Sequence, residues 1–296
     1  MTVLSLLGLS IGLVAAGISA SKSVFTKLAT RRTDSLFVTL FSRTAGFTLL
    51  LPFTLFLLLD SSIPTNDDFL IAVFVGGTIL AFMSYLVTLA LEKSDLSIVS
   101  PLLSLVPVAV ILPSIIIVGE TPTAGAGIGV GLISVGSYLL NIGKRSKGLL
   151  KPIESIFEDR GAQFTLLAVL LFAVVPSLNK LALDTVSPIV LTTFQLPVSA
   201  MVLCIVGLRR IPELSEEING NLKYLLAMSI TTALLFVVQF TGYQYAQVSY
   251  IQAIKQVKVV IAVGAGYYIF NEDGLKERLS GGIVMVIGAI LVLVLS

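Results

Sequence analysis

The chain lacks the residues on which most catalytic and metal sites depend. It has no histidine, no tryptophan and one cysteine, Cys204, among 296 residues. A single cysteine excludes an intrachain disulfide framework, and without histidine the usual Cys/His metal clusters are excluded too. No acid pair or nucleophile–base set is visible either. We therefore expect no metal, no cofactor and no enzymatic activity.

Charge is also scarce. Only 12% of the residues are charged, whereas 56% are hydrophobic and the mean hydropathy is +1.01. A soluble domain of this size cannot bury that much apolar surface, so we expect lipid to be its solvent. The net charge of +2 says little about partners. We expect the bilayer and a small molecule as partners, and no nucleic acid.

The apolar residues form ten segments, each close to the roughly 20 residues that a helical span needs. The segments are 3–21, 36–59, 69–91, 96–118, 122–142, 162–182, 188–208, 222–245, 248–270 and 276–295. The first is not preceded by the basic residues of a secretory signal, so we expect it to be retained. The sequence thus predicts an all-α integral membrane protein with ten transmembrane helices.

The second half of the chain repeats the first at a shift of about 152 residues. The matching residues are Lys27 and Lys180, Ser97 and Ser249, Glu120 and Glu272, Gly129 and Gly281, and Gly136 and Gly288. An odd number of spans per copy makes the second copy enter the bilayer upside down, which is typical of secondary transporters. We predict two inverted five-helix repeats at 1–142 and 162–296, joined by a linker at 143–161.

Basic residues concentrate in the loops that follow the first, third, fifth, seventh and ninth segments. They are Lys22, Lys27, Arg31, Arg32, Lys93, Lys144, Arg145, Lys147, Lys151, Arg160, Arg209, Arg210, Lys223, Lys276 and Arg278. The positive-inside rule then places these loops and the linker in the cytoplasm and both termini outside a cell membrane. A reporter fusion that places the C-terminus in the cytoplasm would contradict this orientation.

The order of motifs resembles a known family over essentially the whole chain. The first copy has Tyr85 in its third segment, Pro107 in the fourth, then Glu120 and a glycine-rich fifth. The second copy has Tyr243, Ser249, Glu272, Gly281 and Gly288 in the corresponding order. This pattern is similar to the EamA-type transporters of the drug/metabolite transporter superfamily. The resemblance implies a ten-helix bundle with a central cavity, which moves a small metabolite by alternating access and is not an enzyme.

The chain departs from the family in two respects. Pro101, Pro107 and Pro113 of the fourth segment face Ala253, Val259 and Ala265 in the ninth. The missing prolines argue against a symmetric pair of bent helices. Many family members are also described with both termini inside, whereas the charges here place them outside.

Four cations fall within predicted helices: Arg43, Lys180, Lys255 and Lys258. Lys258 lies about 15 Å into its helix, where a lysine cannot easily reach the headgroups. We expect Lys255 and Lys258 to attract an anionic or zwitterionic substrate that polar neighbours orient. Those neighbours are Gln239, Tyr243, Gln244, Gln252 and Gln256, together with Tyr85, Asn179 and Lys180. The alternative is structural, because such side chains also join helices to one another.

The remaining candidates have structural and functional interpretations. Arg43 is expected to pair with Glu92, or Glu92 takes part in proton coupling. Glu120 and Glu272 are expected to cap the helices that follow them. Lys27 and Lys180 either reach the lipid headgroups or gate opposite mouths of the central cavity. The glycines of the fifth and tenth segments pack inside the monomer or form a homodimer.

The favoured function is a secondary transporter of a small metabolite, anionic or zwitterionic. A flippase for a lipid-linked metabolite is a variant that uses the same fold. An ion channel is an alternative of another class, and it would require a ring of like residues. The two unequal halves argue against such a ring.

Overall fold

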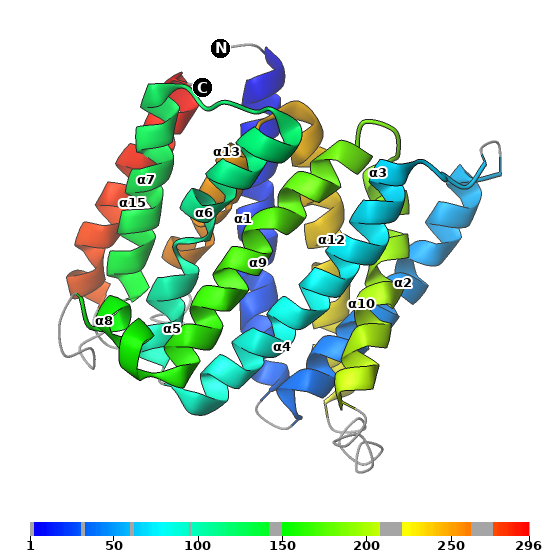
Figure 1. Cartoon of the computed structure of the whole chain (residues 1–296), viewed down its shortest axis with the longest axis horizontal. Helices are drawn as coiled ribbons and strands as arrows, with labels where there is room; N and C mark the ends of the chain where they lie inside the picture. Colours follow the sequence, from blue (N-terminus) through cyan, green and yellow to red (C-terminus); the bar gives the residue numbers. More distant parts are fainter. Residues whose placement is uncertain are drawn as a thin grey trace.

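A computed structural model describes residues 3–30, 33–59, 62–94, 96–141, 150–207, 221–261 and 275–295, and every regular element in these ranges is helical (Figure 1). The first half contains α1 (Val3–Ala29), α2 (Ser35–Leu57), α3 (Asp67–Leu70), the π-helix η1 (Ile71–Gly76), α4 (Gly77–Lys93), α5 (Leu96–Leu103), α6 (Val106–Pro113), the π-helix η2 (Ser114–Val118) and α7 (Ala124–Asn141). The second half contains α8 (Lys151–Glu158), α9 (Arg160–Ala182), α10 (Pro188–Gly207), α12 (Leu222–Tyr245), α13 (Val248–Lys255) and α15 (Leu275–Leu295).

Each of the ten predicted segments contains helix in the part of the chain that the structure describes, although turns interrupt some of them. Seven helices in that part of the chain are long and apolar enough to cross a membrane. Two more apolar helices, at Ala124–Leu140 and Ser280–Leu295, are shorter. The protein is therefore a multi-pass membrane protein, and the full number of ten spans stays a prediction.

The first helix is longer than its sequence predicts. It was expected to end at residue 21, but α1 continues to Ala29. The hydroxyls of Ser21, Ser23 and Thr26 donate to the carbonyl four residues earlier in each case, so these polar side chains are satisfied by the helix itself. As a result Lys22 and Lys27 belong to the helix and not to the loop.

The two halves run in opposite directions. Gly8, near the start of α1, packs against Ala246, directly after α12. Lys180, near the end of α9, donates to the main-chain carbonyl of Tyr243 in the last turn of α12. The start of α1 and the end of α9 therefore lie at the same end of the molecule, so the first helices of the two copies are antiparallel.

Helix packing follows the pseudo-two-fold relation between the two inverted repeats. α1 packs against α12, and α9 packs in the equivalent way against α4. The glycine-rich helices α7 and α15 lie face to face, and a Cβ at Gly129 would lie 2.7 Å from the carbonyl oxygen of Gly288. A Cβ at Gly136 would likewise lie 2.6 Å from the carbonyl oxygen of Gly281. These glycines are thus used inside the monomer, and a homodimer stays a prediction.

The fourth and ninth helices both break, and they do so at equivalent residues. Between α5 and α6, the N–H groups of Ser104 and Leu105 donate to carbonyls three residues back instead of four. Between α13 and the helical residues 258–261, Gln256 and Val257 do the same. The expectation of an asymmetric pair is therefore wrong.

The two breaks do not share a local cause. Pro107 lacks the N–H that would bond the carbonyl of Leu103, which explains the first break. Residues 251–261 contain neither proline nor glycine. What the two helices share is that α13 packs against α6. We infer that this contact, rather than local propensity, shapes the ninth helix.

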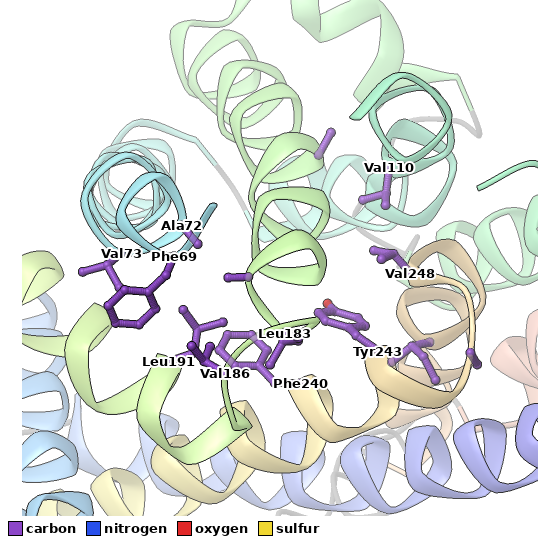
Figure 2. Packing of buried hydrophobic residues seen from close by; sticks show 14 of the residues in the cluster. Phe69, Ala72, Val73, Val110, Leu183, Val186, Leu191, Phe240, Tyr243 and Val248 are labelled. Carbon is purple, nitrogen blue, oxygen red and sulfur yellow. The ribbon is translucent and has the colours of Figure 1, made fainter. Parts of the chain in front are cut away.

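A large apolar core joins the two halves at the end of the molecule where α12 ends. Figure 2 shows Phe240 and Tyr243 of α12 beside Leu183, Val186 and Val248. The same cluster extends to α3, η1 and α6 of the first half. Side chains from both repeats therefore pack together at this end of the molecule.

Candidate functional site

Tyr243 is the centre of a buried polar network between α12 and α13. Its hydroxyl accepts hydrogen bonds from the side-chain amides of Gln239, at 2.5 Å, and Gln252, at 2.8 Å. The ammonium of Lys255 donates to Oε1 of Gln239 at 2.6 Å and lies 5.6 Å from the ring centroid of Phe172. All four polar side chains are buried. The structure thus brings together four of the predicted substrate-binding residues.

A second polar group lies at the end of the molecule where α12 ends. The carboxylate of Glu120 lies 3.6 Å from the ammonium of Lys180, which also contacts the main chain of Tyr243. The other carboxylate oxygen accepts the N–H of Val248, the first residue of α13, at 2.8 Å. Burial raises the pKa of this carboxyl, and the bonds from Val248 and Lys180 act against that rise.

Glu120 therefore caps a different helix from the one expected. The sequence predicts that it caps the next helix, α7, but Thr123 does so by accepting the N–H of Ala126. Glu120 instead caps α13 of the other repeat, so it joins the two halves. Its repeat partner Glu272 lies outside the described residues.

Arg43 of α2 is buried, and two of its three guanidinium nitrogens have no hydrogen-bond partner in the described part of the chain. It is 4% exposed, and its Nε and Nη1 atoms have no hydrogen-bond partner. Its guanidinium carbon lies 5.0 Å from the ring centroid of Phe236. The Glu92 side chain is not among those described, so the expected pair with Arg43 stays a prediction.

Lys22 is a further cation of the helical bundle, which the sequence alone placed in the loop after the first segment and the structure places in α1. Its ammonium lies 5.9 Å from the same Phe236 ring. Lys258, just after the break in the ninth helix, is half-buried, and Gln256 in the break is buried. Lys22 would have been placed inside the helix if the helix had been extended through the hydroxyl side chains of Ser21, Ser23 and Thr26.

Three predicted residues lie apart from the Tyr243 network. Asn179 accepts the amide of Gln195, which also donates to the main chain of Ala72, so this pair joins α9, α10 and η1. Gln244 is exposed and donates to the carbonyl of Leu183. Tyr85 packs with an apolar group that includes Leu36 and Leu203. Gln195 had no signal in the sequence beyond being polar in an apolar segment. The side chain of Lys27 is not described.

Comparisons with known proteins agree with this architecture. No curated protein matches the sequence. A protein of known crystal structure, 14% identical, superposes with a TM-score of 0.79 over 98% of this chain and 99% of its own, which shows a shared fold. The sequence pattern of the EamA-like transporter family matches residues 6–142 and 159–294. The chain therefore belongs to the EamA-like transporter family of the drug/metabolite transporter superfamily and is a membrane transporter.

Proposed function

We propose that this protein is a secondary transporter that moves a small anionic or zwitterionic metabolite across the cell membrane by alternating access. The observation that carries the proposal is the pair of inverted halves whose fourth and ninth helices break at equivalent residues and pack against each other. Broken helices at the interface of inverted repeats are where transporters of this kind bind their substrates.

The polar side chains supply the binding chemistry. Ionisable residues in membrane segments are costly, and those kept there face a partner or a substrate pathway. Lys255, held by Gln239 beside Tyr243, is positioned to receive a negative group from a substrate. Gln252 and Tyr243 then provide hydrogen bonds that orient it.

Alternating access requires one end of the site to be closed while the other is open. The apolar core around Tyr243, with the contact between Glu120 and Lys180, serves as the closed end in this conformation. The start of α9, which carries Arg160, lies at the opposite end (Figure 1), and we assign that end and the basic loops to the cytoplasm by the positive-inside rule. A cysteine-labelling assay that finds these loops outside the cell would reverse this assignment.

A ligand screen followed by uptake tests this function. Purified protein is heated in the presence of amino acids, nucleosides, phosphorylated sugars or cationic drugs, because a ligand that binds the folded state raises the melting temperature. We expect an anionic or zwitterionic compound to raise it and to enter vesicles that contain the protein in a saturable manner. Steady ionic conductance in planar bilayers would indicate a channel and overturn the proposal.

A further inference from the structure

Four cations from both repeats gather inside the bundle. Lys22 lies on α1, Arg43 on α2, Lys255 at the end of α13 and Lys258 after the break in the ninth helix. The ammonium of Lys22 and the guanidinium carbon of Arg43 lie 5.9 Å and 5.0 Å from the ring centroid of Phe236. Electrostatic repulsion also links Lys22 to Lys258, and Lys255 to both of them. We call these four side chains the cation cluster. Each member is repelled by at least one other.

Nothing in the described part of the chain neutralises this cluster. No carboxylate there forms an ion pair with any of its four members, and the one ion pair between described side chains joins Lys180 to Glu120. Arg43 is the clearest case, because two of its buried nitrogens have no hydrogen-bond acceptor. Buried guanidinium nitrogens without acceptors are costly unless a ligand supplies the acceptors.

The aromatic neighbours do not replace an anion. Arg43 and Lys22 share the ring of Phe236, which stacks on Phe240, which in turn stacks on Tyr243. A cation–π contact is weaker than a hydrogen-bonded ion pair in a similar setting. This stack does, however, connect the cation cluster to the Tyr243 network. Lys255 belongs to both.

We propose that the cation cluster is a single anion-binding site and that the transported substrate carries at least two negative charges, as phosphate esters and dicarboxylates do. A single negative charge would leave most of the repulsion among four cations in place. The fork of Arg43 suits a carboxylate or phosphate bound through two oxygens. This proposal rests on the proposed transport function and narrows its substrate to one chemical class.

Thermal unfolding of the full chain in detergent tests the site. The probes are inorganic phosphate, glucose 6-phosphate and succinate, with glucose and alanine as uncharged and zwitterionic controls and sodium chloride to match ionic strength. We expect the divalent anions alone to raise the melting temperature with saturation. The Arg43→Gln and Lys22→Gln substitutions should each raise the anion concentration at half-saturation about tenfold or more.

A matched control and the ligand-free proteins separate binding from folding defects. Lys223→Gln removes an exposed lysine at the start of α12 and should leave anion binding unchanged. Without ligand, Arg43→Gln and Lys22→Gln should melt at or above the wild-type temperature, because repulsion is relieved. A lower ligand-free melting temperature with intact anion binding would mean that these residues hold structural ion pairs, and it would overturn the proposal.

The outcomes also distinguish this proposal from the function on which it rests. Saturable uptake of alanine with no stabilisation by any divalent anion would leave the transporter standing and refute the anion site. Stabilisation by phosphate or succinate that is lost in Arg43→Gln supports the site even if vesicles show no uptake. That combination would refute the transport function alone.

Discussion

At the scale of single residues, Asp159 joins the end of α4 to the start of α9. Its carboxylate accepts the N–H of Ala162 at 2.8 Å, and it also accepts the hydroxyl of Ser94, directly after α4. Partial burial raises the pKa of this carboxyl, but the bonds from Ser94, Ala162 and Gly161 together outweigh burial and hold the pKa below its ordinary value. Asp159 therefore stabilises the folded state in its charged form.

We predict that Asp159→Ala lowers stability near neutral pH by about 1 kcal/mol, as the loss of a helix N-cap does. A carboxyl whose pKa is depressed by folding contributes stability above its unfolded pKa, near 3.9, and loses it as the pH falls through the folded value. The gap in melting temperature between wild type and variant should therefore narrow below about pH 4. Glu154→Ala, at an exposed site on α8, is the control. A gap that stays constant down to pH 3 would contradict this role.

The helix on which each charged residue lies was largely predictable from the sequence, but the partner of each residue was not. The sequence placed Arg43, Lys180, Lys255 and Lys258 in helices because charged residues interrupt long apolar runs there. It left Lys22 in a loop because hydroxyl side chains that bond their own helix look polar in a sequence. The bond between Glu120 and α13 was not predictable, since these residues meet only when the two repeats pack together.

At the scale of helices, the fourth and ninth show the limit of local rules. Prolines predicted a bend in the fourth helix, and their absence from the ninth argued against a symmetric pair of bent helices. The ninth helix breaks at the equivalent place, although no local breaker is present. Tertiary packing across the pseudo-two-fold relation outweighs helix propensity here, because propensity differences are only a fraction of a kcal/mol per residue.

The contact between α7 and α15 gives a sharp prediction for a pair of helices. A methyl group at Gly129 would lie within 3 Å of the main chain of α15, whereas one at Gly127 meets nothing within 4 Å. Gly129→Ala should therefore cost about 1–3 kcal/mol of stability through overpacking. Gly127→Ala should be neutral or stabilising by up to about 1 kcal/mol, because alanine favours helix. Equal melting temperatures for the two variants in detergent would contradict the close contact.

At the scale of the whole molecule, internal repetition made the fold predictable. Five apolar segments per copy require the second copy to be inverted, and the opposite directions of α1 and α9 confirm that inversion. The cation cluster could not be predicted in the same way. Its four members come from three helices and the segment after the break in the ninth, distant in the sequence, and their proximity depends on how the repeats pack.

Anion counterflow tests the central claim most directly. Vesicles containing the protein are loaded with whichever of inorganic phosphate, glucose 6-phosphate and succinate stabilises it most, and entry of the labelled compound is followed. An alternating-access transporter of divalent anions should show saturable entry accelerated by unlabelled anion inside. Entry should fall about tenfold or more in Lys255→Gln and Lys258→Gln, and stay unchanged in Lys223→Gln. The claim would be contradicted by entry that neither saturates nor responds to internal anion. Equal entry in the wild type and the three variants would contradict it too.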